Sequence, residues 1–191
     1  YIEAGGVGVF IPAGTFLQPS KEGQAALTAL VLKYLGKTSG KIADLFCGVG
    51  TFSYPLAQKP GNRVLAVDAS KELLEGFKNS VNRQMIANIE IVCRNLFKYQ
   101  LEGAELEGLA AVVFDPPRAG AKEQAARLAA LPAGKRPRKL IAVSCNPETF
   151  ARDAEILQNG GYRLCEVTPV DQFVYTSHCE LVALFVDEGL L

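Results

Sequence analysis

Continuous apolar runs alternate with amphipathic segments along most of this chain. Seven runs have the length and composition of strands: residues 41–47, 63–68, 89–95, 109–115, 139–145, 162–170 and 180–187. Five segments have the 3.6-residue period of a helix: residues 21–35, 52–58, 71–84, 122–131 and 147–158. Strands that are apolar on both faces and alternate with helices predict an α/β fold, with a mostly parallel sheet covered by helices on both sides.

The first 19 residues have no helical period and are rich in glycine, so we expect a short hairpin or an extended lead-in there. Residues 20–191 should form a single domain, because the chain is long enough for one buried core and too short for two ordinary domains. The sequence begins at Tyr1, within an apparent strand, so we expect it to be the C-terminal part of a longer protein.

Glycine and polar residues follow the ends of the predicted strands. In open α/β sheets, ligands bind beyond the carboxyl ends of the strands. The first strand ends in DLFCGVGTFS, where Gly48 and Gly50 allow a tight turn and a close approach of a ligand to the backbone. Later strands end at Asp68, Asn95 and Asp115, and two prolines after Asp115 end its strand abruptly. These residues should meet at one edge of the sheet.

The loop at Gly48 suits two kinds of cofactor. Gly48 and Gly50 begin the G-x-G-x-x-G pattern of dinucleotide sites, and an acidic residue follows about 20 positions later. Ser53 replaces the third glycine, however, and Asp44 precedes the loop, where a carboxylate would repel a pyrophosphate and attract an ammonium and a sulfonium group. We therefore favour S-adenosylmethionine; an NAD-dependent oxidoreductase and a glycine turn without a ligand are the alternatives.

The segment SCNPETFARD, residues 144–153, joins the fifth strand to a helix. Asn146 is a good N-cap and Pro147 suits the first helical position, so Cys145 should lie at a helix N-terminus. Two interpretations of Cys145 follow from this stretch alone. It is a small buried hydrophobic side chain, the commoner role of a free cysteine, or a nucleophile whose thiolate the helix dipole favours.

The last strand begins with Glu180, where a carboxylate is costly unless it is paired or kept at the rim. His178, the only histidine, is the rival candidate for a base because imidazole titrates near neutral pH. Arg118 follows the two prolines and either contacts a phosphate or fixes the turn at Asp115.

Composition narrows the function classes. Twenty basic and twenty acidic residues cancel, so the chain lacks the strong positive field of a non-specific nucleic-acid binder. Five cysteines without a C-x-x-C pair, and one histidine, predict no structural zinc or iron–sulfur site in this chain. An odd number of cysteines fits a reducing cytoplasm. No apolar run approaches the roughly 20 residues that cross a bilayer.

Five stretches together resemble one family, the RNA uracil-5-methyltransferases, which make 5-methyluridine in transfer or ribosomal RNA with S-adenosylmethionine. These stretches are GTFLQPS, DLFCGVGTFS, DPPRAG, SCNPETFARD and PVDQFVYTSHCE, and the similarity covers residues 10–185. The resemblance implies a class I methyltransferase fold with seven strands, of which the last is antiparallel. That arrangement would bring Glu180 to the edge that carries Cys145.

The resemblance also implies roles for individual residues. Cys145 would be the nucleophile and Glu180 the general base. The cofactor contacts would be Gln18, Phe46, Thr51, Asp68, Asn95 and Asp115, with Gly48 and Gly50 supplying the close backbone approach. An RNA substrate is implied, although the N-terminal RNA-binding domain and cysteine-rich segment of many members are not in this sequence. The alternatives are a methyltransferase that modifies another base position without a cysteine nucleophile, and a cofactor-binding RNA module without catalysis.

Overall fold

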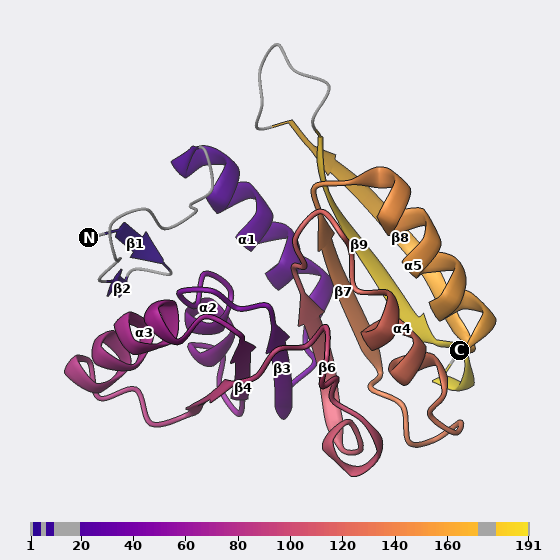
Figure 1. Ribbon diagram of the computed structural model, residues 1–191, viewed down its shortest axis with the longest axis horizontal. Helices are drawn as coiled ribbons and strands as arrows, with labels where there is room; N and C mark the ends of the chain where they lie inside the picture. Colours follow the sequence, from indigo (N-terminus) through magenta and orange to yellow (C-terminus); the bar gives the residue numbers. More distant parts are fainter. Residues whose placement is uncertain (1, 5–6, 10–19, 172–178, 191) are drawn as a thin grey trace.

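The computed structural model describes residues 2–4, 7–9, 20–171 and 179–190. Its centre is a seven-stranded sheet with the order β5-β4-β3-β6-β7-β9-β8 (Figure 1). The strands are β3 (Lys41–Leu45), β4 (Arg63–Asp68), β5 (Ile89–Cys93), β6 (Leu109–Phe114), β7 (Lys139–Ser144), β8 (Tyr162–Val170) and β9 (Glu180–Asp187). The strand β9 is antiparallel to both of its neighbours, and the other strands are parallel to one another. The predicted α/β fold and its antiparallel last strand are confirmed.

Within the described residues, five α-helices flank this sheet. They are α1 (Lys21–Leu35), α2 (Ser53–Ala57), α3 (Lys71–Arg83), α4 (Lys122–Ala129) and α5 (Pro147–Asn159). Two single turns of 3₁₀-helix cover Gly103–Glu105 and Glu188–Leu190. Side-chain caps begin three of the helices, because Ser20, Ser70 and Asn146 each accept a hydrogen bond from a backbone N–H in the first turn.

The sheet separates two apolar layers. On one side, buried residues of α1, α2 and α3 pack against one set of strand positions, including Ile42 and Val113. On the other side, α4 and α5, which lie side by side in Figure 1, pack against the alternate positions, including Ala43 and Val112. Both faces of the central strands are therefore buried, which explains why these strands are continuous apolar runs in the sequence.

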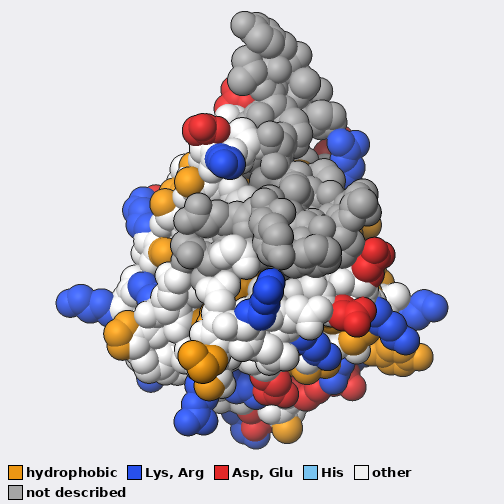
Figure 2. All heavy atoms as spheres, turned by 90° about the vertical axis from the view of Figure 1, so that its left-hand side faces the viewer, with side chains coloured by type: hydrophobic (Ala, Val, Ile, Leu, Met, Phe, Trp, Pro, Cys, Tyr) orange, Lys and Arg blue, Asp and Glu red, His pale blue; other side chains and the backbone are white. Residues whose placement is uncertain are grey.

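The surface is mixed in charge. On the face drawn in Figure 2, lysine and arginine side chains are scattered, with acidic side chains among them. Two further strands, β1 (Ile2–Ala4) and β2 (Val7–Val9), form a separate antiparallel pair near the N-terminus. No helix within the described ranges is long and apolar enough to cross a membrane.

The loop after β3 is shaped by two glycines with left-handed backbones. Gly48 has φ 54° and Gly50 has φ 90°. A Cβ atom on Gly48 would meet no heavy atom within 4 Å, whereas one on Gly50 would lie 2.5 Å from the ring of Phe77 in α3. The backbone at Gly50 therefore packs closely against the core residue Phe77, whereas the backbone at Gly48 faces open space.

This difference predicts unequal costs for two matched substitutions. Gly48→Ala adds only left-handed strain, about 1 kcal/mol, and should lower the melting temperature by about 3 °C. Gly50→Ala adds a clash with Phe77 as well, so we expect a loss of about 3 kcal/mol and a fall of about 10 °C. Calorimetric melting of the two variants checks this. Equal losses would show that Phe77 can move away at no cost.

Candidate functional site

A cavity of about 580 Å³ opens at the carboxyl ends of the parallel strands. This volume lies in the range of small-molecule and cofactor sites. Of the ten site residues that the sequence predicts, seven line the cavity: Phe46, Gly48, Thr51, Asp68, Asp115, Cys145 and Glu180. Gly50 and Asn95 are not among the lining residues. Gln18 and His178 lie outside the described residues.

Asp68, the last residue of β4, ties two loops together. Its Oδ2 atom accepts a hydrogen bond of 2.9 Å from the Gly48 N–H, and its Oδ1 atom accepts one of 2.8 Å from the Ser70 N–H. The glycine loop after β3 is thereby held against the start of α3. Each carboxylate oxygen keeps a second lone pair, so Asp68 can still accept hydrogen bonds from a ligand in the cavity.

Asp44 lies beneath the glycine loop, whereas the sequence predicts it beside the ligand. It is fully buried and does not line the cavity. Its Oδ2 atom accepts a hydrogen bond from the hydroxyl of Ser53, and its Oδ1 atom has no partner. Burial raises the pKa of Asp44 to about 7. Ser53 stands where a dinucleotide motif has its third glycine, so this contact gives that substitution a structural role.

Asn95 forms a turn at the end of β5. Its side-chain Oδ1 accepts a hydrogen bond of 3.0 Å from the backbone N–H of Phe97. This Asx turn is followed by Leu96 and Phe97, which line the cavity together with Arg94. These three residues were missed by sequence reasoning, although an exposed aromatic residue directly after an Asx turn at a strand end is a usable signal.

An aromatic pair forms part of the cavity wall. The ring centroids of Phe46 and Phe97 are 5.4 Å apart, and their planes are tilted by 50°. Phe46 has φ 61°, which is a strained conformation for a bulky side chain and is typical of functional sites. The two rings give this part of the cavity an apolar surface of the kind on which a planar base packs.

Cys145 and Glu180 are brought together by the pairing of β7 with β9. The antiparallel register pairs Ser144 with Leu181, so the next residue of one strand and the preceding residue of the other lie at the same edge. Both side chains line the cavity. Glu180 is only 4% exposed, and its Oε2 atom has no hydrogen-bond partner. Burial raises the pKa of the Glu180 carboxyl.

The environment of Cys145 opposes the thiolate that the helix dipole was expected to favour. Burial, followed by the charges of Glu180 and Asp115, raises the pKa of the Cys145 thiol, and Arg118 acts weakly in the opposite direction. Cys145 does precede α5, and Asn146 caps that helix by accepting a hydrogen bond of 3.0 Å from the Glu148 N–H. The cysteine is therefore held at a helix N-terminus but lies in an acidic part of the cavity.

Asp115 forms a group with the carboxyls of Glu180 and Asp44, whose negative charges raise the cost of ionising it. Burial is the main cause that raises its pKa to about 8, and the charges of Glu180 and Asp44 add to the effect. Carboxyls crowded in this way favour a positively charged ligand. Among the described residues, no group of three or more His, Cys, Asp or Glu side chains could hold a metal ion. The arrangement of carboxyls suits a ligand that carries positive charge.

The chain matches known RNA methyltransferases along most of its length. Residues 10–187 match the family model of tRNA (uracil-5-)-methyltransferases. An uncharacterized RNA methyltransferase of Brucella melitensis is 47% identical over 96% of this chain and 43% of that protein. A 23S rRNA (uracil(1939)-C(5))-methyltransferase of Shewanella amazonensis is 34% identical over 97% of this chain and 41% of that protein. The chain thus spans less than half the length of these relatives.

One solved structure combines a similar fold with a recognisable sequence. It is a tRNA (uracil-54, C5)-methyltransferase of Pyrococcus abyssi in complex with S-adenosyl-L-homocysteine. It superposes with a TM-score of 0.74 at 31% identity, over 91% of this chain and 40% of that one. Together with the family model, this likeness confirms the resemblance inferred from the motifs. The chain belongs to the tRNA (uracil-5-)-methyltransferase family.

Proposed function

We propose that the protein methylates carbon 5 of uridine in ribosomal or transfer RNA, with S-adenosylmethionine as the methyl donor. This chain supplies the cofactor site and the two reacting side chains, Cys145 and Glu180. The observation that carries the proposal is the convergence of the Cys145 thiol and the unpartnered Oε2 of Glu180 on one cavity, in a chain of this family. The named relatives act on ribosomal RNA in one case and transfer RNA in another.

The cavity has features that suit the cofactor. When bound, S-adenosylmethionine supplies an electrophilic methyl group on a positively charged sulfur. Asp68 and Asp115 would hold its cationic and hydroxyl groups, and Phe46 with Phe97 would pack against its base. The open space over Gly48 leaves room for a ligand against the backbone. The Pyrococcus abyssi relative was solved with the demethylated product of this cofactor.

Cys145 starts the reaction because carbon 5 of uracil is a poor nucleophile. The thiolate of Cys145 adds to carbon 6, and the electrons of the 5,6 double bond move into an enolate. Bound S-adenosylmethionine would supply the methyl group that carbon 5 takes up, with the electron pair of the methyl–sulfur bond left on the sulfur. Uracil is thereby activated by one covalent bond that the protein later releases.

Glu180 completes the reaction by removing the proton of carbon 5. The 5,6 double bond then re-forms, and the carbon–sulfur bond breaks with its electrons returning to Cys145. Burial makes the Glu180 carboxylate a stronger base than an exposed one, because it raises the pKa of the group. The target base has to leave its stack to reach both side chains, so a flipped or single-stranded uridine is the expected substrate.

Positive charge in the cavity favours the thiolate of Cys145. Burial raises the pKa of the Cys145 thiol, and the charges of Glu180 and Asp115 raise it further. A cation in the cavity offsets those two charges and restores access to the thiolate. Nucleophile activation is in this way coupled to cofactor binding. The five free cysteines are compatible with the reducing cytoplasm in which we place the protein.

The raised pKa of Cys145 is also the one observation that favours another mechanism. A methyltransferase that acts on an exocyclic amine or another base position needs no thiolate, and Cys145 would then only pack. Substituting Cys145 separates the two possibilities.

Cys145→Ala should abolish methyl transfer to RNA isolated from cells that lack the enzyme, with a loss of at least about 10³-fold. Glu180→Gln should still form the bond between sulfur and carbon 6 but fail to release it. After reaction with RNA from cells that lack the enzyme, denaturing gels should therefore show a stable protein–RNA complex for Glu180→Gln. They should show none for the variant that carries both Cys145→Ala and Glu180→Gln. Retained methylation by Cys145→Ala would contradict the covalent mechanism and support the alternative.

Asp115→Asn should change how stability depends on pH. Because the pKa of Asp115 is raised to about 8 in the folded state from an ordinary value of 3.8, folding binds a proton. The resulting stabilisation is complete below pH 3.8 and is lost as pH rises through about 8. At pH 8.5 we expect the ligand-free variant to be more stable than wild type by about 2 kcal/mol, with the difference shrinking toward pH 4.

Thermal melts across this pH range measure the effect, and Glu155→Gln provides the matched control because it removes an exposed carboxylate from α5. Parallel pH profiles for wild type and Asp115→Asn would show that Asp115 is ionised in the empty site.

A further inference from the structure

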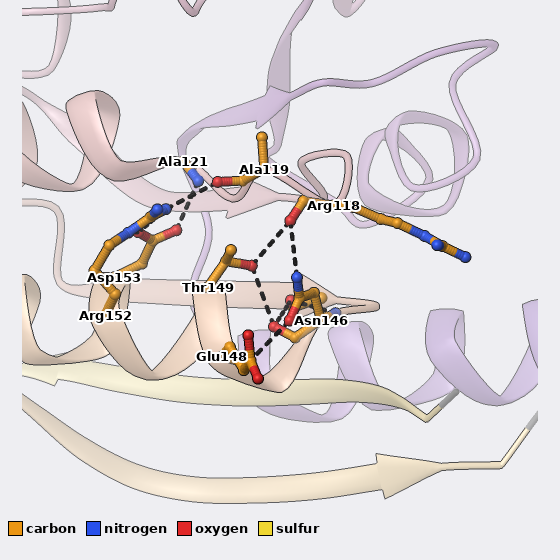
Figure 3. A network of polar contacts seen from close by, with 9 residues as sticks. Arg118, Ala119, Ala121, Asn146, Glu148, Thr149, Arg152 and Asp153 are labelled. Atoms are coloured by element: carbon orange, nitrogen blue, oxygen red, sulfur yellow. Dashed lines mark hydrogen bonds and ion pairs between the residues drawn. The ribbon is translucent and has the colours of Figure 1, made fainter. Parts of the chain in front are cut away.

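The first turns of α5 are joined to the loop between β6 and α4 by side-chain hydrogen bonds (Figure 3). Asn146 Nδ2 donates to the carbonyl oxygen of Arg118 at 3.1 Å. The hydroxyl of Thr149 lies 3.2 Å from the same oxygen and can donate to it. The side chain of Arg118 points away from these contacts in Figure 3, so its backbone is held while its guanidinium stays available to the cavity.

The next turn of α5 holds the second half of the loop. Asp153 Oδ2 accepts a hydrogen bond of 2.6 Å from the Ala121 N–H, at the start of α4. Asp153 Oδ1 accepts from Arg152 Nε at 2.9 Å and from Nη2 at 2.7 Å. Arg152 Nη2 also donates to the carbonyl oxygen of Ala119 at 2.9 Å. We call Asn146, Thr149, Arg152 and Asp153 the loop clamp.

Gly120 shows how closely the loop approaches the clamp. Its φ is 76°, and a Cβ atom there would lie 2.6 Å from Arg152 Nη2, 2.7 Å from Asp153 Oδ2 and 3.0 Å from Thr149 Cβ. Asp153 is 4% exposed, so its two acceptor oxygens are committed inside the protein. A contact this close and this well satisfied fixes the loop in one place.

The clamp takes over where the sheet stops holding the two reactive segments together. The ladder between β6 and β7 ends at the pair Phe114 and Ala142. Asp115 follows that last pair on one strand, and Cys145 lies three residues beyond it on the other. Each segment is still paired on its other side, because the Asp115 N–H donates to the Leu45 carbonyl oxygen and Ser144 pairs with Leu181. Between the two segments, side chains of α5 provide the link that strand pairing no longer makes.

We propose that Arg152 and Asp153 are positioning residues for methyl transfer: they hold the Asp115–Ala121 loop against the helix behind Cys145, and so set Asp115 and Cys145 at the distance that the reaction requires. The proposal rests on the proposed function of the site. Neither residue lines the cavity, so both act through the backbone that they hold. Misplacement by about 1 Å is enough to cost roughly 100-fold in rate.

Asp153→Asn keeps the size of the side chain but replaces one acceptor oxygen by an NH₂ group. That group cannot accept a hydrogen bond from the Ala121 N–H or from Arg152. We expect the single-turnover rate of methyl transfer to fall by about 100-fold, while the affinity for S-adenosylhomocysteine, measured by calorimetry, changes by less than about threefold. Arg152→Lys keeps the charge but loses the planar fork, so it should retain an intermediate rate, about tenfold below wild type. The full-length protein and RNA from cells that lack the enzyme are the reagents.

Glu155→Gln on the same helix is the matched control and should leave rate and affinity unchanged, because Glu155 is exposed. All rates are taken well below each melting temperature, where a purely structural role leaves the rate unaltered. A wild-type rate in Asp153→Asn, or a loss of cofactor affinity as large as the loss of rate, overturns the positioning role. Absence of methyl transfer by the wild-type protein would instead remove the proposed function, and the positioning role with it.

Discussion

The candidate site depends on the antiparallel direction of one strand, β9. Because β9 is antiparallel to β7, the first residue of β9 lies at the edge where β7 ends. Glu180 and Cys145 are 35 positions apart in the sequence and meet through this register. A parallel strand at the same place would present its carboxyl end, Asp187, to the cavity and carry Glu180 to the opposite edge. The pairing of these two strands therefore determines which acid lies at the same edge as Cys145.

The carboxyls at this edge suit a positively charged ligand, but burying them lowers the stability of the protein without that ligand. Asp44 and Glu180 each bury one oxygen that lacks a hydrogen-bond partner. Burial and mutual repulsion raise the pKa of Asp115 to about 8. Uncompensated buried polar groups are costly to a fold, and they are found where function requires them. In our proposal Asp115 helps to hold the cofactor, while the charges of Asp115 and Glu180 add to the effect of burial in keeping the Cys145 thiol protonated.

Much of the fold was predictable because both faces of the central strands are buried, which gives each strand an unbroken apolar run. The helix starts at Ser20 and Asn146 were predictable from local capping chemistry. Burial was not predictable from strand position alone: Asp44 lies under the glycine loop, and Gly50 meets Phe77 across the core. The partnership of Cys145 with Glu180 required the family resemblance, since nothing local in the sequence reports the direction of β9.

The loop clamp illustrates what sequence patterns leave out. Thr149, Arg152 and Asp153 are polar residues near the start of a helix, a pattern that is equally typical of a solvent-exposed face. Their partners are backbone groups about 30 residues earlier in the chain, as for Ala121 and Asp153, which are 32 positions apart. The hydrogen bonds to the loop and the close approach at Gly120 show that this face is in contact with the rest of the protein.

The central claim is that Cys145 bonds to the target uridine inside this cavity. The most direct measurement is peptide mapping after the full-length protein has reacted with S-adenosylmethionine and RNA containing 5-fluorouridine, which has no proton on carbon 5 for a base to remove. Our account predicts that the peptide with Cys145 carries one methylated fluorouridine nucleotide after nuclease digestion. Attachment at another cysteine, or methylated RNA without any attached peptide, would contradict it.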